Sequence, residues 1–108
     1  MKIITTPQDE FPDSPTWPHV LAFARRMEAK LEANRHKGNR EAWLNDDVAA
    51  LIVRLDEERI EMEREAGRVA LGPSGVLPIH AETLANECAD VANFAMMIAD
   101  WHLERAKG

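Results

Sequence analysis

The chain has 108 residues, which is the length of one domain. Hydrophobic residues make up 45% of it and charged residues 30%, a composition typical of globular proteins and too apolar for a disordered one. Thirteen basic against nineteen acidic side chains leave a formal charge of −6, the wrong sign for a protein that binds a nucleic-acid backbone through counterion release. These numbers exclude two enzymatic domains and argue against a nucleic-acid partner.

Cysteine content and hydropathy indicate the compartment. Cys88 is the single cysteine, so an internal disulfide is excluded and a reducing environment is the expected one. The apolar runs fall far short of the roughly 18 residues that a membrane span needs, and the N-terminus lacks the apolar core and cleavage site of a signal peptide. We therefore expect a cytoplasmic protein without a membrane partner.

Prolines are concentrated in the first 18 residues, which have neither helical nor strand periodicity. We expect residues 1–15 to form an extended arm of a single domain whose helical core spans about 16–107. Either Ser14 followed by Pro15, or Thr16 with Pro18 shortly after it, provides an N-cap for a first helix. Its apolar stripe repeats at spacings of four, three and four residues and predicts an amphipathic helix that ends near Asn34. The stripe consists of Val20, Ala24, Met27 and Leu31.

The polar segment 36–40, which contains Gly38, predicts a connecting loop. Asn45 or Asp46 can cap a second helix, at about 46–66, which Gly67 would end.

Glycines and prolines between residues 68 and 78 predict a second loop. No glycine or proline interrupts the chain from Ile79 to Lys107, so this segment is expected to be the longest helix. Three helices and no strand pattern predict an all-α fold, an antiparallel bundle of three main helices. Leftover apolar surface suggests that a second copy completes a four-helix bundle, as a homodimer or homotetramer.

Four acidic side chains fall on the apolar stripes of the second and third helices. Glu58 lies three residues after Leu55, and Glu61 follows one turn later on the same side. On the third helix, Glu87 and Asp90 repeat this spacing. Two acidic pairs are therefore expected to face each other inside the bundle.

Buried carboxylates that lack compensation cost several kcal/mol each, and neither helix offers enough inward basic side chains to neutralise all four. Either protons, with raised pKa values, or a divalent cation must balance them. A set of oxygen ligands suits a hard ion, Mg²⁺ first and Mn²⁺ second. The alternative interpretation is a solvated acidic face without a ligand.

Other metal and nucleotide sites fit the sequence less well. A di-iron bundle needs Glu-x-x-His, but the residues three after Glu58 and Glu87 are acidic. A zinc hydrolase is disfavoured because Cys88 stands alone and the histidines form no His-x-x-x-His pair. Neither a Walker loop nor a Gly-x-Gly-x-x-Gly run is present.

The segments Glu57-Glu58-Arg59-Ile60-Glu61 and Glu87-Cys88-Ala89-Asp90 resemble the two motifs of the MazG-like, all-α nucleoside triphosphate pyrophosphohydrolases. That superfamily, which also contains dimeric dUTPases and dCTP pyrophosphatases, is marked by Glu-Glu-x-x-Glu on one helix and Glu-x-x-Asp on the next. The resemblance covers roughly residues 20–102.

The resemblance implies cleavage between the α and β phosphates of a nucleoside triphosphate, which yields the monophosphate and pyrophosphate. Glu58, Glu61, Glu87 and Asp90 would hold one or more Mg²⁺ ions that neutralise and orient the triphosphate. Glu57 would help to position or deprotonate the attacking water, so Glu57, Glu58 and Glu61 are the candidate catalytic residues.

Further residues are candidates for substrate binding, each with a structural alternative. Asn93 could bind a sugar or phosphate, or join two helices. Lys37 could meet phosphate oxygens or belong to a solvated loop. Trp43 and His36 could stack on or bracket a base, or the indole could anchor a helix junction. Arg59 departs from the family pattern and would weaken a metal site if it turned inward.

Three functions remain open. The first is a Mg²⁺-dependent pyrophosphohydrolase acting on nucleoside triphosphates. The second is a catalytically silent MazG-like module that binds a nucleotide or a partner protein for regulation. The third is a plain helical assembly protein, which would bind neither Mg²⁺ nor nucleotide specifically.

Overall fold

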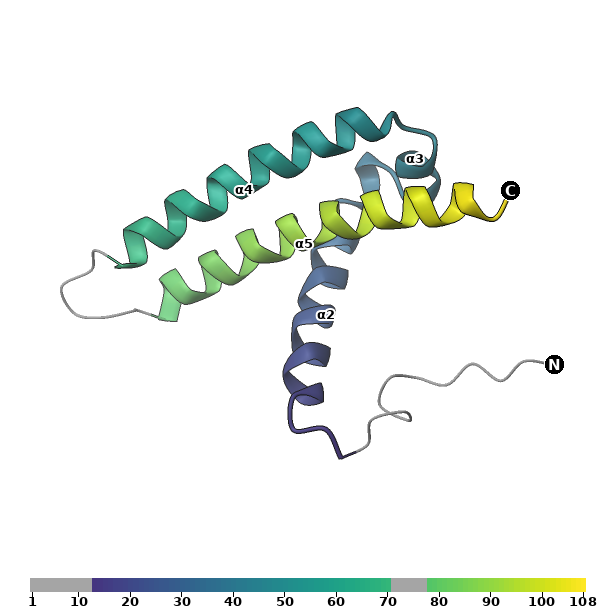
Figure 1. Ribbon diagram of the computed structural model, residues 1–108. Coiled ribbons are helices and arrows are strands. Elements are labelled where there is room, and N and C mark those ends of the chain that lie inside the picture. Colours follow the sequence, from purple (N-terminus) through teal and green to yellow (C-terminus); the bar gives the residue numbers. More distant parts are fainter. Residues whose placement is uncertain (1–12, 71–77) are drawn as a thin grey trace.

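The computed structural model describes residues 13–70 and 78–108, and these residues contain helices and no strand. The predicted all-α class is confirmed (Figure 1). No helix in the described ranges is long and apolar enough to span a membrane. Most of the predicted arm, and most of the loop predicted before Ile79, lie outside the described residues. In chain order the elements are α2 (Trp17–Ala33), the 3₁₀ helix η1 (Arg35–Lys37), α3 (Arg40–Leu44), α4 (Val48–Ala70) and α5 (Pro78–Ala106).

Helix α2 agrees with the sequence-based prediction at both ends. Thr16, one of the two predicted caps, occupies the N-cap position, but its side chain makes no capping hydrogen bond. Pro18 lies in the first turn, where the missing N–H of proline costs no helical hydrogen bond. At the other end, the Asn34 side chain donates a hydrogen bond to the carbonyl oxygen of Lys30, 3.0 Å away. The same carbonyl also accepts from the backbone N–H of Asn34 at 3.2 Å, so Asn34 closes the last turn of α2 through both its side chain and its backbone.

Helix α3 is absent from the sequence-based prediction: it begins at Arg40, the last residue of the predicted loop 36–40, and ends before the predicted second helix at about 46–66. Asn39 caps this short helix by accepting a hydrogen bond from the backbone N–H of Glu41 at 3.1 Å. The turn before it requires Gly38, which has a φ of 131°. A Cβ atom there would lie 2.6 Å from the Cβ of Ala42, so only glycine fits.

Helix α4 is shifted relative to the prediction of 46–66. Its cap is Asp47, whose Oδ1 accepts from the backbone N–H of Ala49 at 3.0 Å, rather than Asn45 or Asp46. The helix also continues past Gly67 to Ala70. A glycine inside a helix costs only about 1 kcal/mol relative to alanine, which was not enough to end this one.

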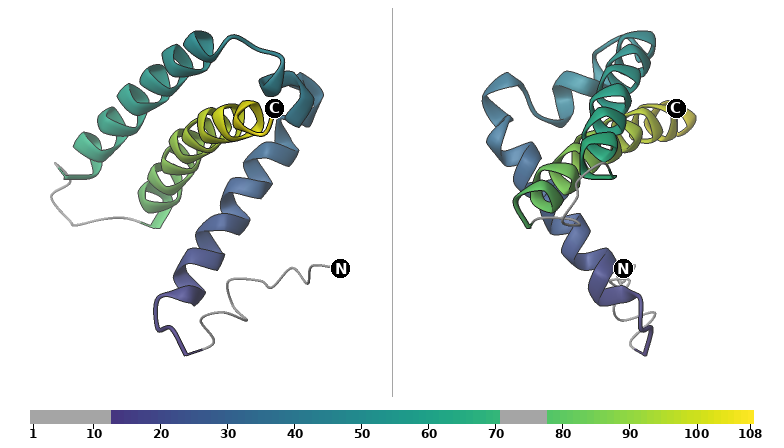
Figure 2. Two further views of the ribbon diagram at one scale, coloured as in Figure 1. Left: turned by 45° about the vertical axis from the view of Figure 1, so that its right-hand side comes forward. Right: turned by 90° about the vertical axis from the view of Figure 1, so that its left-hand side faces the viewer.

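Helix α5 agrees with the predicted segment 79–107 to within one residue at each end and runs without interruption. It is the central element. α4 lies antiparallel to it in a hairpin, α2 crosses it steeply on another side, and α3 contacts its C-terminal half (Figures 1 and 2). The antiparallel arrangement therefore joins α4 and α5, whereas α2 does not lie alongside them.

Few side chains are buried in this arrangement. Leu51 and Ala89 are the buried apolar residues of the described part, and no large side chain there is completely buried. Two polar residues, Glu65 and Asn93, are also buried. Several aliphatic side chains remain exposed, namely Val20, Ile52, Val53, Ile60, Ile79 and Leu103.

Candidate metal centre

Three of the four predicted acidic residues converge between α4 and α5. Glu58 and Glu61 from α4 and Glu87 from α5 each offer a carboxylate oxygen, and these oxygens all lie within 4.8 Å of one another. Glu58 is less accessible than Glu61, which is exposed, and only 14% of the Glu58 side chain is exposed. The three-residue spacing brings the α4 acids onto one face, and the antiparallel hairpin brings Glu87 opposite them.

Ionisation of the clustered carboxyl groups is unfavourable, as the pKa values of Glu58 and Glu87 show. Burial, followed by the neighbouring charges of Glu61 and Asp90, raises the pKa of Glu58 to about 7. Burial is also the main cause that raises the pKa of Glu87, and the charge of Glu61 adds to it. Near neutral pH the binding of protons or of a cation to the cluster is therefore favourable, because either one reduces its negative charge.

A divalent cation fits these residues. The Oε2 atom of Glu87 is buried and has no hydrogen-bond partner among the described residues, which is costly for a carboxylate unless another ligand satisfies it. The ligand atoms are all carboxylate oxygens, the type that Mg²⁺ and Mn²⁺ prefer. No histidine or cysteine accompanies them in this group.

Asp90, the fourth predicted ligand, stands beside the group with a different partner. Its Oδ2 lies 3.4 Å from the Nζ of Lys30, which reaches across from α2. About a fifth of the Asp90 side chain and a third of the Lys30 side chain are exposed. Asp90 is thus close enough to influence Glu58 and Glu87 electrostatically while it forms an ion pair of its own.

Arg54 forms a second basic contact with the acids. Its guanidinium lies 3.3 Å from Glu57 and 3.8 Å from Glu58, and it stacks over the ring of Phe94 with 5.2 Å between its Cζ and the ring centroid. Glu57 has 59% of its side chain exposed and does not belong to the converging group. The structure therefore places the predicted water-positioning residue beside Arg54, outside the cluster.

Arg59, which could have occupied the acidic cluster, points away from it. Its guanidinium forms ion pairs with Asp56 at 2.7 Å and Glu63 at 2.8 Å, on the outer face of α4. Arg59 therefore does not neutralise Glu58.

A cavity of about 400 Å³ adjoins the acids. Glu58, Glu61 and Asp90 line one part of it, together with Lys30 and Arg54. Other parts of the wall are apolar or aromatic and come from Leu31, Trp43, Phe94 and Met97. The cavity thus joins a charged region to an apolar one, a combination that suits a ligand with a charged end and a planar or apolar end.

Asn93 joins two helices and also borders the cavity. Its Nδ2 donates to the carbonyl oxygen of Met27 on α2 at 3.0 Å, so the predicted structural alternative is present. Only 4% of Asn93 is exposed, and its Oδ1 is buried without a hydrogen-bond partner among the described residues. This free atom is an acceptor, so it can bind the N–H or O–H of a ligand but not an unprotonated phosphate oxygen.

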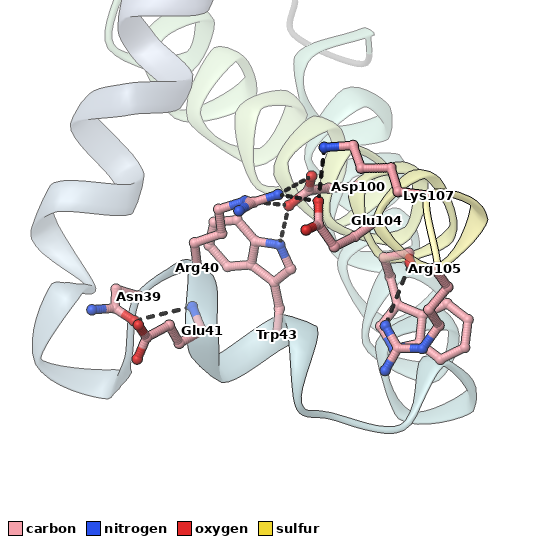
Figure 3. Close-up of polar contacts among 9 residues, drawn as sticks. Asn39, Arg40, Glu41, Trp43, Asp100, Glu104, Arg105 and Lys107 are labelled. Carbon is pink, nitrogen blue, oxygen red and sulfur yellow. Dashed lines mark hydrogen bonds and ion pairs between the residues drawn. The ribbon is translucent and has the colours of Figure 1, made fainter.

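Trp43 is anchored beside the cavity by a charged network at the end of α5 (Figure 3). Its Nε1 donates to Asp100 at 2.9 Å, and Arg40 forms two hydrogen bonds to the same carboxylate, both 2.9 Å long. These hydrogen bonds, led by those from Arg40, hold the pKa of Asp100 below its ordinary value. Arg40 also reaches Glu104 at 3.1 Å. The predicted anchoring role of the indole is therefore present, and its ring still borders the cavity.

The other two predicted substrate-binding residues differ in position. Lys37 lines the cavity from the end of η1, whereas His36 is exposed and does not line it. The expected bracketing of a base by His36 has no geometric support in this arrangement.

Sequence reasoning missed three charged residues at the site. Arg54 lies four residues before Glu58, a spacing that could have identified it. Glu65, four residues after Glu61, is buried and forms an ion pair with Arg68 at 3.1 Å. No sequence spacing could have identified Lys30, because its contact with Asp90 depends on how α2 crosses α5.

Comparisons with protein-family models, with curated proteins and with solved structures found no match for this chain.

Proposed function

We propose that the protein is a Mg²⁺-dependent nucleotide pyrophosphohydrolase that cleaves (d)NTP to (d)NMP and pyrophosphate. The observation that carries the proposal is the convergence of Glu58, Glu61 and Glu87. Glu58 and Glu61 line a cavity, and Glu87 has a buried oxygen without a hydrogen-bond partner among the described residues. The motif resemblance supports it from the sequence. Mn²⁺ is the expected substitute for Mg²⁺.

When bound, the cation would neutralise the triphosphate and help to align it for in-line attack by water. Side chains of the protein would bind the base and sugar and position the water. Trp43 and Phe94 provide flat apolar surface for a base, and the free Oδ1 of Asn93 would accept a hydrogen bond from a sugar hydroxyl or a base N–H. Glu57 is the proposed water-positioning residue, and it would have to leave Arg54 to reach the water.

A catalytically silent module that binds nucleotide is the second candidate, and a specific observation favours it. Lys30 pairs with Asp90, while Arg54 contacts Glu57 and Glu58, so part of the acidic charge is already compensated. A site in which these contacts persist would bind its ligand without turnover.

We also propose that the chain assembles as a homodimer or homotetramer in which helices from different copies complete the bundle. The described part of a single copy has little buried apolar surface, and α2 crosses α5 instead of covering the hairpin. Val53 and Ile60, seven residues apart on α4, are 57% and 38% exposed. Burial of such side chains against a second copy would be favourable by about 25 cal/mol for each Å² of apolar surface removed from water.

The experiment incubates the purified protein with each common and deaminated (d)NTP, with Mg²⁺ or with EDTA, and identifies the products by ion-exchange chromatography. Monophosphate and pyrophosphate are expected in equal amounts, only with Mg²⁺. Glu58→Gln should abolish turnover, whereas Glu63→Gln, an exposed glutamate on the same helix, should retain it.

Nucleotide binding without turnover would establish the silent module instead. Neither turnover nor Mg²⁺-dependent nucleotide binding would contradict both functions and leave a plain helical assembly protein.

A further inference from the structure

Positive side chains approach the acids from the cavity walls. Lys30 and Lys37 lie seven residues apart at the end of α2 and in η1, and both line the cavity. The same cavity is lined by Glu58, Glu61 and Asp90 from α4 and α5, and Lys30 lies beside Asp90. A cavity that carries both acidic and basic side chains suits a ligand pair made of a cation and a polyanion rather than either one alone.

Lys30 is the basic residue most directly tied to the acids. Its Nζ lies 3.4 Å from Asp90, and its charge also acts on Glu87, whose pKa it lowers against the larger effect of burial. A third of the Lys30 side chain is exposed, so its ammonium group can change partner without unfolding α2. A lysine is well suited to such a change because its charge sits on a flexible four-carbon stem.

The surroundings point to a ligand independently of the acids. Asn93 is 4% exposed and lines the same cavity, and its buried Oδ1 lacks a hydrogen-bond partner among the described residues. The Nδ2 of Asn93 donates to the carbonyl oxygen of Met27, one turn before Lys30, so Asn93 on α5 contacts the stretch of α2 that carries Lys30. A buried acceptor without a partner is unfavourable, and a hydrogen bond from a ligand would remove this cost.

We propose that Lys30 alternates between two partners: it neutralises Asp90 while the acids hold no cation, and it binds an anionic oxygen of the polyphosphate once a divalent cation occupies the acids. This inference rests on the proposed function. The cation would replace the positive charge of Lys30 at Asp90 and release the ammonium group toward the cavity. Cation and polyphosphate would then bind cooperatively, because each makes the site more favourable for the other.

The proposal gives one substitution two effects of opposite sign. Removing the Lys30 charge should strengthen the binding of Mg²⁺ alone, because Asp90 loses its competing partner. The same change should weaken the binding of a polyphosphate in the presence of Mg²⁺, because an anionic oxygen loses its partner. A lysine that serves only as a fixed counterion of Asp90 would produce the first effect without the second.

The test is isothermal titration calorimetry with Mg²⁺ alone and with bis(methylene)triphosphonate, a triphosphate analogue that resists hydrolysis, at saturating Mg²⁺. Relative to the wild type, Lys30→Gln should bind Mg²⁺ about two- to fivefold more tightly and the analogue about fivefold or more weakly. Lys30→Arg should retain the analogue affinity. Arg25→Gln, which removes the same charge from an exposed site on α2, should change neither.

Circular dichroism and thermal unfolding of each variant verify that the fold is intact. Unchanged analogue affinity in Lys30→Gln, or weaker Mg²⁺ binding, would overturn the proposal while the proposed function stands. A wild-type protein that binds no Mg²⁺ would overturn both.

Discussion

Glu58 on α4 and Glu87 on α5 present carboxylate oxygens within 4.8 Å of each other, and burial raises the pKa of both. Two like charges held this close in a partly buried place are unfavourable unless something positive joins them. The hairpin therefore keeps an arrangement that costs stability in the absence of a ligand, and this cost can be measured.

The pH dependence of stability should reveal it. Because Glu58 has a pKa of about 7 in the folded protein and an ordinary value of 4.5, the folded state binds more protons between these pH values. The contribution of Glu58 to stability therefore falls as pH rises through this window. Glu58→Gln should be more stable than the wild type at pH 8 in EDTA, by up to about 3 kcal/mol.

Urea unfolding at pH 4 and pH 8 measures the effect. The two proteins should converge at the lower pH, and added Mg²⁺ at pH 8 should stabilise the wild type but not Glu58→Gln. Equal stabilities at pH 8 would mean that Glu58 ionises without cost and that the cluster lacks the proposed electrostatic strain.

Arg54 and Arg59 provide a matched pair on α4. Arg54 contacts Glu58 at 3.8 Å, whereas Arg59 binds Asp56 and Glu63 on the outer face. Arg54→Gln should strengthen Mg²⁺ binding by about two- to fivefold, while Arg59→Gln should leave it nearly unchanged. Calorimetric titration of both variants gives the comparison, and equal changes would indicate a general charge effect instead of a local one.

Two glycines should respond to alanine in opposite ways. Gly38 has a φ of 131°, and a Cβ there would lie 2.6 Å from the Cβ of Ala42, so Gly38→Ala should destabilise the protein by about 1–3 kcal/mol. Gly67 lies inside α4 with nothing within 4 Å of an added Cβ, so Gly67→Ala should stabilise it by about 0.5–1 kcal/mol. Urea unfolding measures both, and a stable Gly38→Ala variant would disprove the tight turn before α3.

The outer face of α4 should control assembly. If Val53 and Ile60 meet a second copy, Ile60→Glu should reduce the sedimentation mass to that of a monomer, while Ile60→Leu should preserve the assembly. A wild-type protein that sediments as a monomer at micromolar concentration would contradict the proposed oligomer.

The main helices, and the helix face on which the acidic residues lie, could be predicted from the sequence because both depend on local spacing. The three-residue steps from Glu58 to Glu61 and from Glu87 to Asp90 repeat with the helical period, so their shared face follows from geometry. Helix α3 was missed because its five residues span little more than one helical turn and show no apolar periodicity. The hydrogen bond from Trp43 to Asp100 that anchors it joins residues far apart in the sequence.

Long-range contacts could not be derived in the same way. Lys30 and Asp90 are 60 residues apart, and their ion pair depends on the steep crossing of α2 over α5. Hydrophobic periodicity indicates which face of a helix is buried but not the angle at which it packs. The two expected roles of Asn93 illustrate the same limit, since its bond to Met27 joins two helices while its buried Oδ1 has no partner in the described part of the chain.

Titration of Mn²⁺, followed by the electron paramagnetic resonance signal of the free ion, tests the acidic cluster most directly. We expect saturable loss of the free-ion signal with wild-type protein, competition by Mg²⁺, and binding about tenfold weaker or worse in Glu58→Gln and Glu87→Gln. Glu63→Gln, which changes an exposed glutamate paired with Arg59, should bind like the wild type. Equal Mn²⁺ binding by all four proteins, or no saturable binding by any, would contradict a metal centre at Glu58, Glu61 and Glu87.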